Sequence, residues 1–339
     1  MKTATKLLLI ISTLLILIGS LTFVIAMSIL NWDFSKISTS KYLTNEHSVT
    51  EDFDDISIES ATADIEFLPS KDSKCSVVCY EKKNLIHEVS VKDGVLSVKL
   101  NDTRKWYHHI GIDFKSPKIT VYLPKTEYES LVISSKTGDV EIPDDFKFEC
   151  IDITNKTGDI TCSASAFGKI KIKATTADIT LRGLSAASID ISVTTGDINA
   201  SKISCEGELK LGVSTGDVSL SDIACKSLVS TGDTGDMTAK DTSVSGKISI
   251  ERDTGKVSLA STEAKTLKIE TDTGDVRLSG SDASDIYIIT DTGDVEGSLL
   301  TEKVFITRTD TGSVSVPSST SGGRCEITTD TGDIKITIK

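Results

Sequence analysis

Aromatic side chains are scarce in this chain of 339 residues. They make up 5% of it, while 38% of the residues are hydrophobic, so a core must be built mainly from aliphatic side chains. Sugar grooves generally use aromatic platforms, yet from residue 131 to 339 there is no tryptophan and a single tyrosine, Tyr287. The shortage of rings therefore disfavours sugar and cofactor sites.

The chain also lacks an excess of positive charge. Its 37 Lys and Arg residues face 50 Asp and Glu residues, which gives a net charge of -13. Such a chain has no general attraction for phosphate backbones or anionic lipid surfaces, so nucleic acid is excluded as a partner. Residues 131 to 339 hold 22 basic and 33 acidic residues, and this part therefore carries -11 of the total.

Familiar catalytic motifs are missing as well. The sequence has no Gly-x-Ser-x-Gly, no phosphate-binding loop and no dinucleotide fingerprint. We expect a protein that is not an enzyme, with no catalytic or cofactor-binding residues and no cofactor. The four histidines all precede the repeats described below, and adjacent His108 and His109 would point apart on a strand, so a shared metal is not expected there.

A long apolar run near the N-terminus predicts a membrane anchor. Residues 7 to 32 carry no charge after Lys2 and Lys6, and the helix over 7 to 30 would span roughly 36 Å at about 1.5 Å per residue. The lysines place the N-terminus in the cytoplasm and residues 33 to 339 outside the cell, with residues 7 to 30 in the cell membrane. A signal peptide cleaved after Ala26 is the competing interpretation.

A repeat built on Thr-Gly-Asp dominates the rest of the chain, with 19 or 20 residues between successive copies. Its central residues are Gly138, Gly158, Ala177, Gly196, Gly216, Gly235, Gly255, Gly274, Gly293, Gly312 and Gly332. Apolar residues recur seven and five positions before the central residue and two positions after it. A period of two residues is typical of strands, and the change from odd to even offsets indicates that the chain turns at the motif. Since Ala177 also fills the glycine slot, a tight corner explains the glycines better than a positive φ.

This pattern predicts an all-β protein, a parallel β-solenoid of about 11 to 12 coils with 19 to 20 residues each. Equivalent residues of successive coils should form columns about 4.8 Å apart. We expect four parts: a membrane anchor over 1–32, a polar stalk over 33–50, a first coil around Thr62-Ala-Asp64 with an antiparallel β cap over 51–130, and the solenoid repeats over 131–339. The cap should contain a hairpin over 89–100 and a strand over 118–123.

With these motifs, the chain resembles the bacterial putative-adhesin family of β-strand-repeat proteins, long catalogued as a domain of unknown function. The resemblance covers residues 50 to 339 and rests on Val121-Tyr-Leu-Pro-Lys-Thr126, the following strand at 131–134, and the Thr-Gly-Asp-Val or Thr-Gly-Asp-Ile repeats behind an N-terminal anchor. It implies a surface-exposed envelope protein, some relatives of which accompany cell-envelope stress systems, and it supplies no catalytic residues.

Two columns of aspartates follow the repeats, one directly after the central residue and one two residues before it. The first interpretation is that each carboxylate accepts hydrogen bonds from N–H groups of its own turn. The alternative is a Ca²⁺ site, because carboxylates stacked about 4.8 Å apart offer the oxygens that hard cations need. The candidate Ca²⁺ ligands are Asp233, Asp236, Asp253, Asp272, Asp275, Asp291, Asp294, Asp310, Asp330 and Asp333.

Seven cysteines follow the anchor. Cys75 and Cys79 would lie on one face of a strand about 13 Å apart, too far to bridge. Cys205 and Cys225 occupy the same column of adjacent coils, either as a disulfide or as two buried thiols that pack as small apolar groups.

These observations favour a non-enzymatic, membrane-anchored extracellular β-solenoid that acts as an adhesin or a cell-envelope stress protein through an unidentified surface partner. One alternative is a polysaccharide-processing β-helix enzyme, which the missing aromatic platforms and the absence of long loops disfavour. Another is an acidic surface that binds cationic peptides or Ca²⁺.

Overall fold

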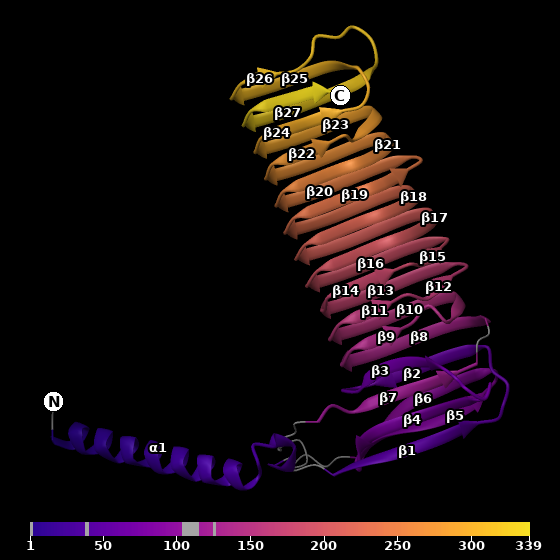
Figure 1. Cartoon of the computed structure of the whole chain (residues 1–339), viewed down its shortest axis with the longest axis vertical. Helices are drawn as coiled ribbons and strands as arrows, with labels where there is room; N and C mark the ends of the chain where they lie inside the picture. The colour runs from indigo at the N-terminus through magenta and orange to yellow at the C-terminus, as the bar shows by residue number, and fades with distance from the viewer. Residues whose placement is uncertain (1–2, 38–40, 104–114, 125–126) are drawn as a thin grey trace.

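The computed structural model describes residues 3–37, 41–103, 115–124 and 127–339 (Figure 1). Helix α1, Thr3–Ile29, stands apart from the β structure, and a short 3-10 helix, Phe34–Ile37, follows it. The α1 segment Thr5–Ile29 has a mean hydropathy of 2.7, and nearly all of its side chains are exposed, with Met27 as the buried exception, so it is long and apolar enough to cross a membrane. Lys2, His108 and His109 lie outside the described residues.

The first part of the β structure is a cap of mixed strands. Its strands are β1 (Tyr42–Val49), β2 (Asp55–Ser60), β3 (Asp64–Pro69), β4 (Cys75–Lys82), β5 (Leu85–Lys92), β6 (Val95–Asp102) and β7 (Lys118–Leu123). Strands β5 and β6 form the predicted antiparallel hairpin. β1 pairs antiparallel with β4, so the polar stalk expected over 33–50 is wrong in its second half, where alternate residues of β1 turn toward the cap interior.

The rest of the chain is a parallel β-solenoid, as predicted. Its first strands are β8 (Glu127–Thr137), β9 (Val140–Ile142), β10 (Lys147–Thr157), β11 (Ile160–Cys162), β12 (Ser165–Ala166), β13 (Lys169–Thr176), β14 (Ile179–Arg182), β15 (Ser185–Ala186), β16 (Ser188–Thr195), β17 (Ile198–Thr215) and β18 (Val218–Thr234). Its last strands are β19 (Met237–Val244), β20 (Lys247–Thr254), β21 (Val257–Thr273), β22 (Val276–Ser279), β23 (Asp282–Thr292), β24 (Val295–Leu299), β25 (Lys303–Thr311), β26 (Val314–Ser315), β27 (Gly323–Thr331) and β28 (Ile334–Ile338).

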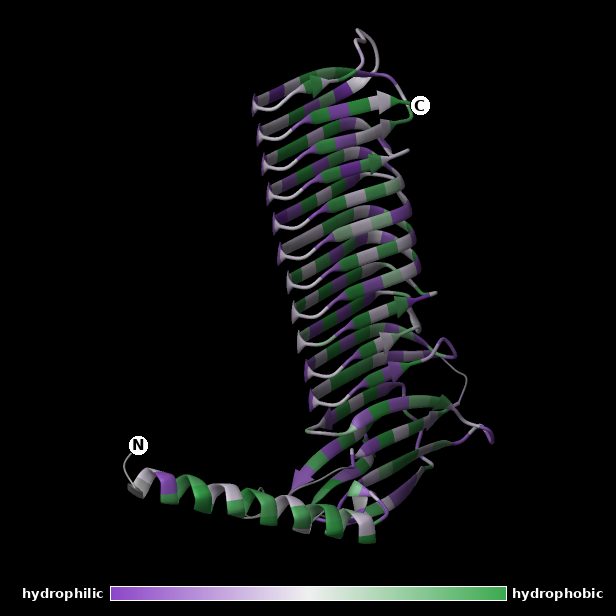
Figure 2. Cartoon of the chain, turned by 60° about the vertical axis from the view of Figure 1, so that its left-hand side comes forward, coloured by the Kyte–Doolittle hydropathy of each residue, from purple (hydrophilic) through white to green (hydrophobic). Residues whose placement is uncertain are grey.

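The predicted columns form the core of the rod. Ile153, Ile172 and Ile191, five residues before their motif centres, pair in register and are buried, and Figure 2 shows hydrophobic stripes repeating from coil to coil. The aliphatic columns therefore set the register, because a slip of one residue would turn each stripe outward.

One coil departs from the apolar columns. The Arg252 side chain is buried, and its Nη2 donates to Ser230 Oγ at 2.8 Å. A Cβ at Gly232 would lie 2.3 Å from Arg252 Nη1, so Ser230 and Gly232 leave the space that the guanidinium fills. Burial lowers the pKa of Arg252, while the charges of Asp217 and Asp233 act against this shift.

The coils do not stack in chain order at the distal end. β27 pairs with β23 on one side and with β25 on the other, and β28 lies in the same way between β24 and β26. The C-terminal coil is thus inserted beneath the coil that precedes it in the sequence. The expectation that neighbouring repeats always stack on one another is wrong here.

The same inversion occurs at the cap. β2 lies between β6 and β8, and β3 pairs with both β7 and β9. The coil built around Ala63 is therefore enclosed by a later segment of the chain, and β1, β4 and β5 close the base. The number of regular coils is slightly smaller than the predicted 11 to 12.

The motif glycines meet two requirements at once. Gly196 has a φ of +126°, and a Cβ there would lie 2.0 Å from the Ala177 carbonyl oxygen. Ala177 itself is not among the residues with positive φ. The prediction that the glycines serve only a tight corner was therefore incomplete, because most of these corners also have a positive φ, which favours glycine.

Candidate functional site

Hydrogen bonds between coils line the Thr-Gly-Asp corner. The carboxylate Oδ1 of one coil accepts the backbone N–H at the same position of the next coil, at 2.7 to 3.1 Å. The acceptors, in stacking order, are Asp64, Asp139, Asp159, Asp178, Asp197, Asp217, Asp236, Asp275, Asp294 and Asp333. The carboxylates thus serve the neighbouring coil's turn, and the expectation that they serve their own turn is wrong.

This ladder explains one of the two substitutions in the aspartate column, Ser313, and leaves Lys256 as a break in the ladder. Ser313 lies on the end coil, where its N–H donates to Asp333 Oδ1 at 2.7 Å, and among the described residues no further coil needs an acceptor from it. Lys256 donates its N–H to Asp236 but offers no side-chain acceptor to Asp275. The hydrogen bond from Ser313 N–H lowers the pKa of Asp333, because it favours the ionised carboxylate.

The second aspartate column, two residues before the motif centre, lies on the exposed side of the corner. Its members are Asp233, Asp253, Asp272, Asp291, Asp310 and Asp330. Asp310 is paired with Arg308 at 3.0 Å. Within the described ranges, the only group of three or more metal-ligand side chains within 4.8 Å lies in the cap, so these carboxylates are not gathered in threes. The Ca²⁺ site stays a prediction.

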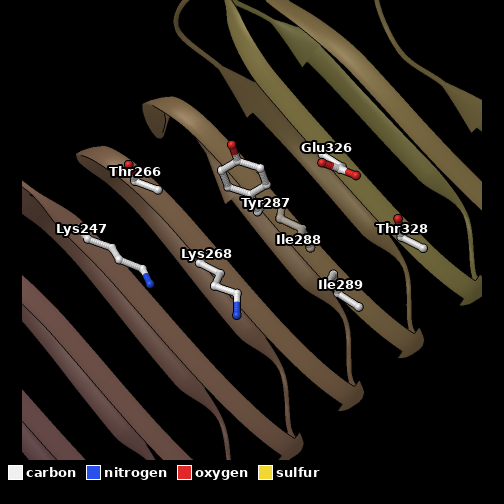
Figure 3. Close-up of a pocket in the computed structure, with 8 residues that line it drawn as sticks. All are labelled: Lys247, Thr266, Lys268, Tyr287, Ile288, Ile289, Glu326 and Thr328. Carbon is white, nitrogen blue, oxygen red and sulfur yellow. The ribbon is translucent and has the colours of Figure 1, made fainter.

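A hollow of about 400 Å³ opens on the flat face of the distal half of the rod (Figure 3). Its lining comes from β20, β21, β23 and β27 and consists of Lys247, Thr266, Lys268, Tyr287, Ile288, Ile289, Glu326 and Thr328. Tyr287 lies between Lys268 of the preceding coil and Glu326 of the following one. Ile289 is 45% exposed. It is an apolar residue between two polar ones, because it pairs with Glu270 on one side and Thr328 on the other.

Two charged residues of this lining, Lys268 and Glu326, form ion pairs. Lys268 Nζ lies 2.7 Å from Glu270 and Arg324 lies 2.6 Å from Glu326, while the Arg324 guanidinium stands 5.7 Å from the Tyr287 ring centre. An apolar and aromatic floor with a charged rim suits the binding of another molecule.

Sequence reasoning missed this hollow for two reasons. Tyr287 and Ile289 occupy outward-facing positions in columns that are otherwise mostly polar. Two such residues close together in the sequence are a signal of an exposed apolar site. Glu326 and Thr328 could not be placed, because chain-order stacking puts Ile306 and Arg308 beside Tyr287 and Ile289. The inserted C-terminal coil therefore supplies one wall of the hollow.

A buried polar cluster lies inside the cap. Cys79, Glu81 and His87 have ligand atoms within 4.8 Å of one another. Glu81 accepts from His87 Nδ1 at 2.8 Å, from the His87 backbone N–H at 2.7 Å and from Asn45 at 2.6 Å. Burial raises the pKa of Glu81, but these hydrogen bonds outweigh it and hold that pKa below its usual range. Burial and the charge of Glu81 raise the pKa of Cys79 to about 12.

The seven cysteines are free thiols. Cys205 and Cys225 are partners on adjacent coils and both are buried, in agreement with the second of the two alternatives. Burial raises the pKa of Cys225 to about 12, which keeps it a neutral thiol. Cys75 and Cys79 share the inward face of β4, as expected.

Solved structures similar to this chain include two described as putative adhesins. The one from Parabacteroides merdae aligns with 76% of this chain and 97% of its own, at 13% identity and a TM-score of 0.45. The one from Parabacteroides distasonis aligns with 88% of this chain and 98% of its own, at 13% identity and a TM-score of 0.41. A putative lipid binding protein from Parabacteroides distasonis has 14% identity, the same coverage and a TM-score of 0.38. None of the curated proteins compared with the chain matches it.

The sequence profile of one family matches most of the chain. It is described as Toastrack DUF4097 and matches residues 53–231 and 224–339. The matched ranges begin in the cap and continue to the last residue, and they confirm the resemblance drawn from the motifs.

Proposed function

Since the chain belongs to the Toastrack family, we propose that it is a non-enzymatic rod, anchored in the cell membrane, that binds a surface partner through the hollow on its distal face. The observation that carries this proposal is the half-buried ring of Tyr287 beside the exposed side chain of Ile289 on a flat β surface. Exposed apolar residues rimmed by charges are typical of interaction sites. The partner is a surface or envelope molecule, in line with adhesion or envelope stress.

The rod geometry supports a binding role. Helix α1 lies at the base of the molecule, and the strands that line the hollow lie toward its other end (Figure 1), so an anchored chain would hold its binding face away from the lipid. Parallel coils held by backbone ladders form a stiff support that keeps Tyr287 and its neighbours fixed before a partner arrives. Preorganisation of this kind lowers the entropic cost of binding.

The proposed orientation has the N-terminus inside and the rod outside. It is supported by Lys6 before the apolar helix and by the acidic mass after it. Protease added to intact cells should then digest the rod, and the membrane fraction should retain the N-terminal peptide. A mature chain beginning near Met27 would instead show a cleaved signal peptide.

Adhesion can be tested with cells that display the full chain. The double variant Tyr287→Ser and Ile289→Ser should reduce attachment to partner cells or to an envelope-coated surface by at least tenfold, since apolar anchors dominate interface energy. Val132→Ser is the matched control, because Val132 is 44% exposed on an outward position near the cap. Equal attachment by all three proteins would refute the proposal.

The exposed aspartate column favours a second candidate function, the binding of cations or cationic peptides. Within the described part of the chain, only Asp310 of its six members forms an ion pair, and stacked carboxylates attract counter-ions. A tetralysine peptide should then bind the full chain in low salt and dissociate as the ionic strength rises. Binding that is insensitive to salt would contradict this candidate.

A further inference from the structure

The base of the rod holds polar side chains where an apolar core would be expected. Cys79 and Glu81 point inward from β4, and His87 points inward from β5. Their exposed fractions are 0%, 1% and 4%. Burying a carboxylate, a thiol and an imidazole together is costly unless each group is satisfied.

Two imidazole nitrogens in this cap have no hydrogen-bond partner. His87 uses Nδ1 on Glu81, and its Nε2 is buried without a partner. His47 Nε2 is also buried without one, and His47 lies on β1 opposite Val77, two residues before Cys79. These unpartnered nitrogens, beside a buried thiol and a buried carboxylate, are donor atoms of the kind that a metal ion takes.

We propose that Cys79, Glu81 and His87 bind a zinc ion in the base of the solenoid. Thiolate, imidazole and carboxylate are the three ligand types that Zn²⁺ takes in proteins, and their ligand atoms already lie within 4.8 Å of one another. One thiolate and one carboxylate balance the two charges of the ion, so the buried complex is neutral. The fourth position is taken by His47 or by a water molecule.

Binding requires one proton to leave. The Cys79 S–H bond breaks as the S–Zn bond forms, the proton passes to the solvent, and no electron is transferred. Zinc affinity should therefore decrease as the pH is lowered, because protons compete with the ion for the thiolate. The site joins β4 to β5, so the ion would pin together two neighbouring strands of the cap.

The test is the metal content of the full chain, purified in mild detergent from zinc-supplemented cells. The wild type should carry close to one zinc per chain, and Cys79→Ser and His87→Gln should each reduce the content by at least tenfold. Cys75→Ser is the matched control, because Cys75 is buried on the same face of β4 but lies outside the group. Circular dichroism confirms that each variant keeps its β structure.

Cobalt substitution gives a second measurement that does not depend on stability. Co²⁺ bound to Cys79 should give a thiolate absorption band in the near ultraviolet in the wild type and in Cys75→Ser, but not in Cys79→Ser. A wild-type chain that takes up neither zinc nor cobalt would overturn the proposal, and the cluster would then be a buried Glu81–His87 pair. Metal content unchanged by Cys79→Ser would overturn it as well.

Discussion

Replacing three consecutive ladder aspartates tests the role of the Thr-Gly-Asp corner. Asp159, Asp178 and Asp197 accept the N–H groups of the next coils at 2.9, 2.9 and 2.8 Å. Alanine at all three positions removes three acceptors, whereas asparagine keeps an oxygen at each. The two triple variants therefore differ in hydrogen bonding and share the loss of three negative charges.

The expected effect follows from the number of bonds. A hydrogen bond of this kind contributes about 1 kcal/mol net to stability, so the triple alanine variant should lose about 3 kcal/mol. The triple asparagine variant should stay close to the wild type, since it also relieves repulsion between stacked carboxylates. Because stability in a repeat protein sums over neighbouring interfaces, the loss should be concentrated in the middle coils.

Urea unfolding of the full chain in mild detergent, followed by far-ultraviolet circular dichroism, measures the free energy difference. Amide hydrogen exchange adds a local measurement: the N–H groups of Asp178, Asp197 and Asp217 should lose protection in the alanine variant and keep it in the asparagine variant. Alanine and asparagine variants of equal stability would refute the reasoning. The carboxylates would then act through charge alone.

Four further outcomes are expected. Ile250→Asp should cost several kcal/mol because Ile250 is buried between Ser230 and Ile269, while Ser249→Asp on the outer face should be nearly silent; equal damage would mean that the register is wrong. The double variant Tyr287→Cys and Glu326→Cys should form a disulfide, because the two residues lie about 4.8 Å apart on paired strands. The double variant Tyr287→Cys and Ile306→Cys should not, because these residues lie two strands apart, at about 9.6 Å. The reverse result would show that the coils stack in chain order. If the aspartate columns bind Ca²⁺, the ion at about 100 times its dissociation constant should add roughly 2.7 kcal/mol of stability, and superimposed melting curves with calcium and with chelator at matched ionic strength would rule the site out. The hydrogen bond from Lys169 lowers the pKa of Asp190 in the folded protein. The stabilisation by this pair is therefore fully present above the usual pKa of 3.8 and is lost as the pH falls through the lower folded pKa. In urea unfolding, the wild type and Asp190→Asn should differ in stability near neutral pH and converge in acid.

The sequence predicted the core of the rod because one column of side chains is one physical requirement repeated. Ile153, Ile172 and Ile191 each fill the same interior position, so the period and the phase change at the motif sufficed to place them. Ser230 is a polar residue in the column five positions before the motif centre. The reason for this polar residue was not visible in the sequence, because it required knowing that Arg252 turns inward.

The order of coils at the two ends could not be predicted in this way. Parallel ladders are made by backbone groups, so any coil that fits the template pairs equally well with any other. Ser313 was the one local indication of the order at the distal end. A coil without a carboxylate at this position is best placed last, because no further coil then needs an acceptor from it. The hollow around Tyr287 depends on this order and was missed with it.

The cap cluster lay beyond sequence reasoning for a different reason. Glu81 and His87 lie six residues apart on the consecutive strands β4 and β5, which pair at Lys82 and Leu85. Alternation placed Cys79 on an inward face, but nothing in the spacing showed which side chains would face it.

The inserted C-terminal coil has a mechanical consequence for a rod that is held at one end and pulled at the other. A last strand at the edge of the stack would unzip one bond at a time, but β27 and β28 are held on both sides and must shear two ladders at once. β1 is different, because among the described strands it pairs with β4 alone and leads directly to α1. Under tension between the helix and a bound partner, β1 should peel away first, and the solenoid should stay intact while the tether lengthens.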